Sequence, residues 1–459
     1  MSVILWVLAV IFLFVVLIRV TRKTQDMHVA LIVLGDIGRS PRMEFHAIEL
    51  SRTSPVSVIC YRETEPIADI VQNKNITLYS LSVLPPLKNF PLRTVVWLTC
   101  YAPVKFIFLA FQLFYHLLFK MPACSHILIQ NPPSLPSFFI AAIVKFLTGC
   151  KVIVDWHNTA YSIVMNVHNM KESNFVIQAL KWYELFLPRY FDYHFTVTEA
   201  MKMFLIEHKI HQELITVLYD KPFVSLTQTE TSRYNIFKQI EHLLPQNAKA
   251  ILELFRNKTE KVIIGVSSTS WTPDEDFSVL FDALLKYEKI EEKLNEKVPK
   301  LLIFITGRGP LKEFYEKKIA EENMQRVCVV PIWLTHEDYP KVLSSCDFGI
   351  SLHQSSSQLD LPMKVLDMYG CGLPVFARGY PALKTELVVE GKFGYCFDDA
   401  QQLEILFEKN IINEQGRQVF LGTMKKNVSE QNNITWSQNW RDVVEPYFRG
   451  EKQERVKKD

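Results

Sequence analysis

Two charged side chains, Lys364 and Asp367, lie three residues apart in Leu359–Ala377, a segment predicted to form a loop, a short helix and a buried strand. This spacing puts both side chains on one face of the helix. An ammonium beside a helix N-terminus suits a phosphate, and a carboxylate one turn later can accept both hydroxyls of a ribose. A surface helix with two solvated charges would give the same pattern, so the pair by itself leaves both interpretations open.

The ends of this helix are predicted from its proline, its acid and its glycines. Pro362 suits the first helical position, because its fixed φ fits and its missing N–H would have no partner there. Asp360 lies where a carboxylate caps free amides. Gly370 and Gly372 are predicted to end the helix before the apolar strand.

Two more loops in the second half follow predicted strands and carry groups that suit a nucleotide. The first is rich in hydroxyls, and Ser268 and Thr269 are predicted to hold phosphate or sugar oxygens. In the second, Gly307 and Gly309 allow the backbone to approach a nucleotide closely, and Arg308 is a candidate for a phosphate contact. Each loop is a weak signal by itself, and the series of three predicts a donor site.

The acidic run Asp274–Asp276 offers two interpretations. Its DxD pattern can hold a metal beside a sugar nucleotide, whereas capping explains an acidic first helical turn equally well. Capping is the preferred explanation, so neither a metal nor a cofactor is predicted. The eight cysteines include no CxxC pair, which argues against a zinc site or a disulfide framework and favours reduced thiols in a cytosol-facing protein.

In the first half, a glycine-rich turn directly follows the first predicted strand. Gly35, Gly38 and the following Pro41, predicted to begin a helix, leave bare amides at a helix N-terminus. Arg39 and Arg42 add positive charge, which makes the turn a candidate site for a phosphate or diphosphate. A tight turn with two solvated arginines would look the same. The turn is not a dinucleotide GxGxxG, so an oxidoreductase is not supported.

Asp155 and His157 lie two residues apart at the end of the strand predicted from Lys151, where polar side chains emerge at the carboxyl edge of the sheet. An imidazole beside a carboxylate is a candidate general base with its orienting partner. A structural histidine bonded to a loop carbonyl is the alternative. Glu199 ends the next predicted strand and is expected at the same edge.

Length and charge limit the class of protein. At 459 residues the chain suggests two domains, and a net charge of +2 gives no electrostatic case for nucleic acid. Ser2–Ile18 is an uninterrupted apolar run followed by Arg19, Arg22 and Lys23. A signal peptide has the opposite order, so the run is predicted to be an uncleaved transmembrane anchor with the body of the protein in the cytosol.

Strand-like and helical segments alternate through both halves, which predicts parallel α/β sheets. The predicted strands are 27–34, 56–61, 126–130, 151–155, 193–198 and 214–219 in the first half, and 261–267, 301–306, 327–331, 347–352, 373–377 and 394–397 in the second. The predicted fold is two Rossmann-like, doubly wound domains that face a cleft. Residues 92–121 are apolar and aromatic, and either lie in a membrane interface or pack against the first sheet. The predicted parts are a transmembrane anchor (1–20), an N-terminal acceptor domain (27–219) with membrane-associated helices near 92–121, a linker (220–260), a C-terminal nucleotide-sugar domain (261–433), a helix that returns to the N-terminal domain (434–448) and a charged tail (449–459).

Five blocks together resemble those of GT-B glycosyltransferases, namely GDIGRSPRM, VDWHN, SSTSWTPDEDF, TGRGP and DLPMKVLDMYGCGLPV. The resemblance is closest to the β-mannosyltransferases that extend the lipid-linked oligosaccharide for protein N-glycosylation. It implies GDP-mannose as donor, dolichyl-diphosphate chitobiose as acceptor, and a single-pass protein of the endoplasmic reticulum membrane with a lumenal N-terminus. Membrane lipid and other glycosyltransferases of the same pathway are the further expected partners.

One departure from the wider family bears on the mechanism. Many retaining GT-B enzymes carry two glutamates eight positions apart, and here Asp367 fills the second place but Leu359 the first. Their Arg/Lys pair is replaced by the hydroxyl-rich Ser267–Thr272 loop, so Lys364 and Arg308 are expected to hold the diphosphate charge. A β-mannoside made from α-linked GDP-mannose requires inversion, which needs one displacement and one general base.

The resulting hypothesis is an inverting, metal-independent β-1,4-mannosyltransferase. His157, oriented by Asp155, is the first candidate for the base, and Asp36 is the second. The glycine-rich turn at 35–42 is expected to hold the acceptor diphosphate or to line the cleft. Two alternatives stay open, namely a polyprenyl-diphosphate glycosyltransferase that uses a UDP-sugar and a catalytically silent, membrane-tethered partner on the same fold.

Overall fold

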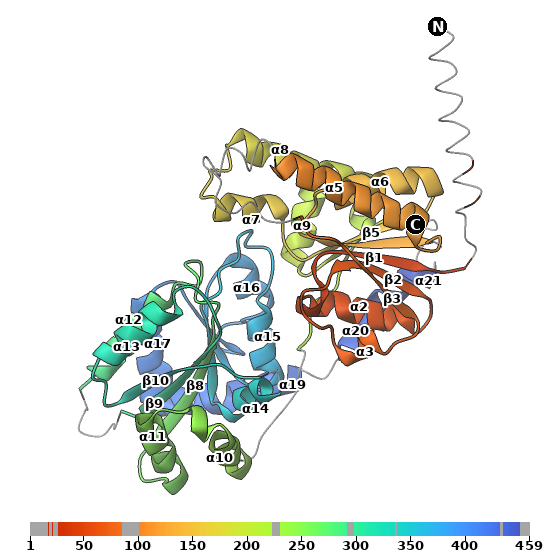
Figure 1. Ribbon diagram of the computed structural model, residues 1–459. Helices are drawn as coiled ribbons and strands as arrows, with labels where there is room; N and C mark the ends of the chain where they lie inside the picture. Colours follow the sequence, from red (N-terminus) through yellow and green to blue (C-terminus); the bar gives the residue numbers. More distant parts are fainter. Residues whose placement is uncertain are drawn as a thin grey trace. The chain divides into compact units, whose positions relative to one another are not determined.

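The computed structural model describes residues 17, 21, 26–84, 101–222, 230–291, 298–335, 337–431 and 435–449. The chain divides into two compact units, both drawn in Figure 1. Unit 1 comprises Met1–Tyr219 with Ser437–Asp459, and unit 2 comprises Asp220–Trp436. The predicted anchor at Ser2–Ile18 lies almost entirely outside the described residues, so it stays a prediction.

Unit 1 is built on a seven-stranded parallel sheet with the strand order β3-β2-β1-β4-β5-β6-β7. Its central strands are runs of Val, Ile and Leu that are buried on both faces, as in a sheet with helical crossovers. The sequence missed β3, because this edge strand is short, half-exposed and weakly periodic. The strands are β1 (Val29–Asp36), β2 (Val56–Tyr61), β3 (Ile76–Ser80), β4 (His126–Asn131), β5 (Lys151–Trp156), β6 (Tyr193–Thr196) and β7 (Ile215–Val217).

Helices lie on both faces of this sheet. In Figure 1, α5, α6 and α8 lie on one side of the strands, and α2 and α3 lie on the other. The polar side chains that end β1 and β5 are therefore held between two helical layers. The helices are α2 (Pro41–Ser51), α3 (Ala68–Val71), α5 (Ala102–Tyr115), α6 (Ser137–Thr148), α7 (Ala160–Val167), α8 (Phe175–Phe186) and α9 (Glu199–Glu207).

The end of the described chain packs on unit 1 as the helices α20 (Trp436–Val443) and α21 (Glu445–Arg449). The hydroxyl of Tyr447 hydrogen-bonds to Thr216 in β7, and its ring packs edge-on against Tyr193 with the centroids 4.7 Å apart. The C-terminal segment therefore forms part of the unit that begins the chain.

Unit 2 contains a six-stranded parallel sheet with the order β10-β9-β8-β11-β12-β13. Each strand matches a segment predicted from the sequence, because these are short apolar runs between helical segments. Aromatic side chains such as Phe348, Phe376 and Phe420 fill its core. The strands are β8 (Val262–Ser268), β9 (Lys300–Thr306), β10 (Val327–Ile332), β11 (Phe348–Ser351), β12 (Val375–Arg378) and β13 (Gly394–Phe397).

The helices of unit 2 include two in the segment 220–260, which was predicted as a linker. Arg233 forms an ion pair with Asp347 at 2.7 Å, and Phe237 stacks on Phe304, so these helices pack on unit 2. The polar residues of this segment, which predicted a linker, lie mainly on the solvent-facing sides of the two helices. The helices are α10 (Glu230–Gln239), α11 (Gln246–Asn257), α12 (Phe277–Glu288), α13 (Lys312–Glu321), α14 (Asp338–Ser345), α15 (Met363–Gly370), α16 (Pro381–Glu386), α17 (Ala400–Phe407), α18 (Glu414–Gln418) and α19 (Lys425–Gln431), with the π-helical turns η7 (Glu408–Ile412) and η8 (Val419–Met424).

The apolar helix α5 buries one face and exposes the other. Leu113 is fully buried, whereas Ile107 and Phe111 are 64% and 66% exposed. In the described part of the chain, Pro103–Lys120 is the helical stretch long and apolar enough to cross a membrane, and 28% of it is buried. The buried face of α5 packs against unit 1, and contact of its exposed face with a membrane stays a prediction.

Two loops at the carboxyl edge of the second sheet pack directly against each other. The amide of Thr269 donates to the carbonyl of Thr306 at 2.8 Å. A Cβ on Gly307 would overlap the carbonyl oxygen of Thr269, and one on Gly309 would overlap that of Ser270. The contact between the loops thus requires both glycines, and the predicted nucleotide contact is not needed to explain them.

Candidate active site

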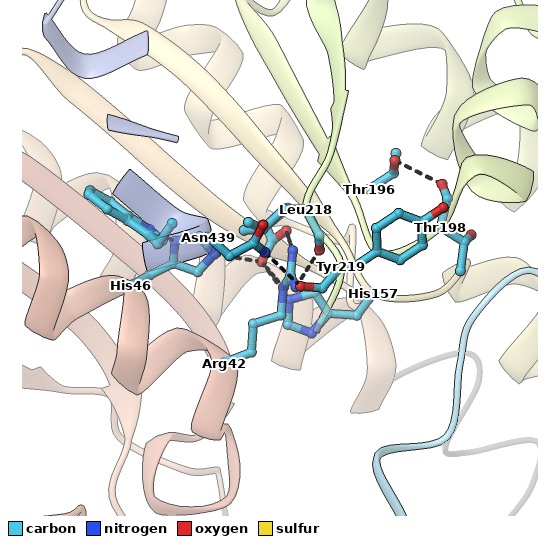
Figure 2. A network of polar contacts seen from close by, with 10 residues as sticks. Arg42, His46, His157, Thr196, Thr198, Leu218, Tyr219 and Asn439 are labelled. Carbon is cyan, nitrogen blue, oxygen red and sulfur yellow. Dashed lines mark hydrogen bonds and ion pairs between the residues drawn. The ribbon is translucent and has the colours of Figure 1, made fainter. Parts of the chain in front are cut away.

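A buried carboxylate is the centre of a polar network in unit 1. Asp155, at the end of β5, has no exposed surface, and Arg42 binds both of its oxygens, with Nε 2.8 Å from Oδ2 and Nη2 2.7 Å from Oδ1. The Nε2 atoms of His46 and His157 lie 3.1 Å and 2.8 Å from Oδ2. Figure 2 shows Arg42, His46 and His157 converging from different elements on this point.

The charge of this carboxylate is balanced inside the protein. Burial alone would raise the pKa of Asp155, but Arg42, His157 and His46 hold that pKa well below its usual range. Arg42 also donates to the carbonyl of Leu218 at 2.9 Å. Since its guanidinium is taken up by Asp155 and Leu218, this position does not support the predicted contact of Arg42 with an acceptor diphosphate.

His157 is the partly exposed member of the network, with 22% of its side chain accessible. The ionised Asp155 can only accept a hydrogen bond, so Nε2 of His157 carries the proton and Nδ1 of the neutral ring holds the lone pair. A carboxylate that fixes the tautomer and direction of an imidazole prepares it to act as a general base. The structure brings together the pair predicted from the sequence, and its catalytic role stays a prediction.

Asp36, the second candidate for the base, is bound to a neighbouring loop. Its Oδ2 accepts from the hydroxyl of Thr64 at 2.6 Å, and its Oδ1 accepts from the amide of Glu63 at 3.0 Å. Burial raises the pKa of Asp36, but these hydrogen bonds outweigh it and lower the pKa. A carboxylate with a lowered pKa is a weak base, so the geometry favours His157.

The glycine-rich turn before α2 is shaped by the same loop. A Cβ on Gly38 would lie 2.6 Å from the hydroxyl of Thr64, so a glycine is required there, whereas a Cβ on Gly35 would have its nearest neighbour at 4.0 Å. Arg39 is 71% exposed and lies 3.5 Å from Asp36. Of the two arginines in the turn, Arg39 is therefore the one that presents its charge to solvent.

Unit 2 has a buried carboxylate of its own. Glu275 accepts from the amide of Ser270 at 2.5 Å and from the hydroxyl of Thr269 at 3.1 Å, and it forms an ion pair with Lys364. The Nδ1 atom of His353 lies 3.6 Å away. Burial raises the pKa of Glu275, but His353, Lys364 and the amide outweigh it, so the pKa is lowered. Glu275 thus fixes Lys364 and the hydroxyl-rich loop relative to each other.

The acidic run before α12 therefore has two functions. Asp276 caps this helix by accepting from the amide of Ser278 at 3.1 Å, as the capping interpretation predicted. Glu275 points inward instead. Among the described residues, no group of three or more His, Cys, Asp or Glu side chains is arranged to hold a metal ion. Independence of a metal stays a prediction.

The start of α15 differs from the prediction by one residue. Pro362 has an extended backbone, with φ −78° and ψ 120°, and precedes the helix, which begins at Met363. Asp360 does not cap it, because its carboxylate accepts from the hydroxyl of Ser355. Gly372 follows the helix with a φ of 74°, a left-handed conformation that glycine adopts without strain.

Asp367 lies one turn after Lys364 but in different surroundings. It is half-buried, and no described residue donates a hydrogen bond to it. Burial raises the pKa of Asp367 to about 7. Nearby, the hydroxyls of Tyr339 and Ser268 are hydrogen-bonded at 2.9 Å. A carboxylate without protein donors has lone pairs available for the hydroxyls of a ligand, as the predicted ribose contact requires.

Arg308 lies on the surface beyond this loop pair. Its guanidinium carbon is 3.7 Å from the ring centre of Trp333, which is itself 49% exposed. No described residue forms an ion pair with Arg308, in contrast to Lys364, whose charge is balanced by Glu275. The charge of Arg308 is thus available to a phosphate.

Three members of these networks were not predicted as site residues, namely His46, Glu275 and His353. His353 follows β11 closely, so the signal that identified His157, a polar residue after a predicted strand, would have found it. Glu275 lies in the acidic run before α12, and helix capping accounts for that run without an inward-pointing glutamate. His46 lies inside α2, where no local pattern indicates its partner.

No family model matches the sequence. The two parallel sheets define a GT-B-like glycosyltransferase fold, which solved structures share. Sucrose-phosphate synthase from Thermosynechococcus elongatus superposes with a TM-score of 0.61 at 12% identity, over 94% of this chain and 100% of that one. Anabaena HepE in complex with UDP and glucose gives 0.57 at 14% identity, over 91% and 98%. At these identities the likeness shows the fold alone.

Closer relatives identify the family. The sequence is 36% identical to the chitobiosyldiphosphodolichol beta-mannosyltransferase of Dictyostelium discoideum, over 92% of this chain and 93% of the relative. The enzymes of that name from Candida glabrata and Homo sapiens are 36% and 35% identical, over 92% and 93% of this chain and 91% and 94% of their own lengths. The chain belongs to the family of chitobiosyldiphosphodolichol beta-mannosyltransferases.

Asp367→Asn is expected to change how stability depends on pH. The folded pKa of Asp367, about 7, lies above the ordinary value of 3.8, so its contribution to stability is full below about pH 4 and is lost as the pH rises through 7. The loss is at most about 4 kcal/mol. Thermal unfolding between pH 5 and 8 should show a flatter profile for the variant than for the wild type. Asp282→Asn, at an exposed site, is the control, and parallel profiles for Asp367→Asn and the wild type would contradict the assignment.

Proposed function

We propose that the protein transfers mannose from GDP-mannose to the 4-hydroxyl of dolichyl-diphosphate chitobiose, with inversion and without a metal. The observation that carries the proposal is family membership over 92% of the chain. The names of the relatives supply the β-mannosyl transfer and the chitobiosyl-diphosphate lipid. The oriented imidazole of His157 supports a mechanism with one general base.

Unit 2 is the proposed donor unit. Asp367 would accept hydrogen bonds from the ribose, and Lys364 and Arg308 would contact the diphosphate together with the free amides of α15. Glu275 holds Lys364 beside the first turn of that helix. A cavity of about 250 Å³, lined in part by Ser355 and Tyr380, lies at the same edge of the sheet and is the proposed place of the mannosyl group.

The proposed reaction is a single displacement at the anomeric carbon. The bond from the acceptor O4 to C1 forms while the bond from C1 to the diphosphate oxygen breaks, and the O4 proton passes to Nδ1 of His157. GDP leaves with the bonding electrons, and Lys364 and Arg308 stabilise its added charge. Asp155 stays ionised and stabilises the imidazolium that forms.

A membrane location suits the lipid acceptor. Aromatic and aliphatic side chains on α5, α6 and α8 are 45–84% exposed, and these helices lie on the same side of the sheet (Figure 1). Together with the Ser2–Ile18 anchor, this face supports a single-pass protein of the endoplasmic reticulum membrane with its catalytic body in the cytosol. The exposed residues include Ile107, Phe111, Phe139, Phe146, Phe175 and Trp182.

The donor assay tests the proposed function directly. The purified full-length protein is incubated with dolichyl-diphosphate chitobiose and with GDP-mannose or UDP-sugars, and the product is identified by mass spectrometry. A β-mannosylated product from GDP-mannose is expected. A product formed only from UDP-sugars would favour the polyprenyl-diphosphate alternative. No turnover, with no thermal stabilisation by millimolar GDP, would favour the catalytically silent partner.

His157→Ala is expected to lower kcat for mannosyl transfer by about 10²–10⁴-fold, because the acceptor hydroxyl loses its proton acceptor. His168→Ala, at an exposed position at the end of α7, is the matched control and should keep normal turnover. Steady-state kinetics with GDP-mannose measure both. Near-normal turnover of His157→Ala together with loss of activity in Asp36→Ala would show that the base is misassigned.

The exposed face of α5 is expected to hold the protein on a bilayer without the anchor. A form that lacks residues 1–25 should sediment with liposomes, and the double substitution Ile107→Asp with Phe111→Asp should release most of it, since charged side chains there cannot enter lipid. Phe314→Asp with Ile405→Asp, two apolar positions on unit 2 that are each 52% exposed, is the control. Equal release by both pairs, or by neither, would refute the role of α5.

A further inference from the structure

Trp440 of α20 reaches the Asp155 network from the far end of the chain. Its indole is 1% exposed, and Nε1 donates to Nδ1 of His46 at 2.9 Å. An indole N–H can only donate, so Nδ1 of His46 is an acceptor and the proton of the neutral ring lies on Nε2. Burial lowers the pKa of His46, which agrees with a neutral ring.

The proton on Nε2 determines the next contact. His46 donates it to Oδ2 of Asp155 at 3.1 Å, and the same oxygen accepts from Nε2 of His157 at 2.8 Å. Arg42 is the charged group that faces this carboxylate. A continuous series of hydrogen bonds therefore runs from Trp440 through His46 and Asp155 to His157.

Contacts outside this series hold α20 in place. The hydroxyl of Ser437 donates to Glu49 of α2 at 2.5 Å, and the side-chain Nδ2 of Asn439 donates to the carbonyl of Tyr219 at 3.1 Å, a bond drawn in Figure 2. The rings of Trp440 and His46 meet edge to face at 6.4 Å. The N–H of Trp440 is thus fixed in direction as well as in position.

We propose that Trp440 and His46 are positioning residues for His157, so that the C-terminal helix forms part of the catalytic apparatus. Without the indole N–H, Nδ1 of His46 loses the donor that fixes the direction of its ring, and the bond from Nε2 of His46 to Oδ2 of Asp155, the oxygen that orients His157, is weakened. The proposal rests on the proposed role of His157 as the base. It is separate from the general function of α20 and α21 in closing the fold.

Trp440→Phe removes the N–H and keeps an aromatic ring, and it tests the proposal in the full-length protein. We expect kcat to fall about tenfold, a fraction of the contribution of a base, while KM for both substrates stays within about twofold. Tyr447→Phe is the matched control, because it removes one hydrogen-bonding atom between the same C-terminal segment and Thr216 of β7, outside the series. It should leave kcat unchanged.

A spectroscopic measurement distinguishes an effect of Trp440 on the orientation of His157 from its effect on the packing of the C-terminal helix. In protein labelled with ¹⁵N-histidine, the side-chain nitrogen shifts report the tautomer of each ring. The wild type and Tyr447→Phe should both show His46 and His157 protonated on Nε2. Trp440→Phe should show a shifted Nδ1 signal of His46, which has lost its hydrogen-bond donor, and a shifted His157 signal.

The outcomes are distinct. Unchanged kcat and unchanged His157 signals in Trp440→Phe, or an equal loss of kcat in Tyr447→Phe, would overturn the proposal. If Trp440→Phe shifts the His157 signal but His157→Ala keeps turnover, the coupling stands and the proposed base fails. If His157→Ala abolishes turnover and Trp440→Phe has no effect, the base stands and the positioning role fails.

Discussion

Asp155 is a charged carboxylate without exposed surface, and such a group is stable only where fixed donors replace the water that it loses. Arg42 supplies the counter-charge through two parallel hydrogen bonds, and two imidazoles complete the set. Loss of either partner of a buried ion pair costs about 3–5 kcal/mol. The pair ties α2 to β5, and through Leu218 to the chain after β7, and His157 takes its direction from it.

Unit 2 also contains a buried carboxylate that is held by a cation, formed by different residues. Glu275 is also a buried carboxylate beside the carboxyl ends of parallel strands, and it is held by Lys364 and by the Ser270 amide. In both units a buried anion joins segments that are far apart in the sequence, 113 positions for Arg42 and Asp155 and 89 for Lys364 and Glu275. The cations that pair with these two carboxylates differ in their exposure, since Lys364 is partly exposed whereas Arg42 is buried. Of these two paired cations, Lys364 is therefore the one that a ligand can reach.

The two acids near the positions of the two-glutamate pattern, Asp360 and Asp367, have different surroundings in the structure. Asp360, one position from the expected first acid, accepts from the hydroxyl of Ser355 and lies 4.0 Å from His353. Asp367, at the second place, accepts no hydrogen bond from the described residues. Asp360 is thus engaged by the protein, and Asp367 is the acid proposed to bind the ribose. This arrangement suits a donor site without a retaining acid pair, in agreement with an inverting family.

Local signals in the sequence predict the two parallel sheets, the α15 segment and the Asp155–His157 pair, because apolar runs and polar residues at strand ends can be recognised without knowing their partners. The partners themselves become visible in the folded chain. Arg42 meets Asp155 across 113 positions, and Trp440 meets His46 across 394. No local pattern encodes such contacts, so Arg42 was assigned to a ligand. Gly307 was likewise assigned to a nucleotide, although the carbonyl of Thr269 is what requires it.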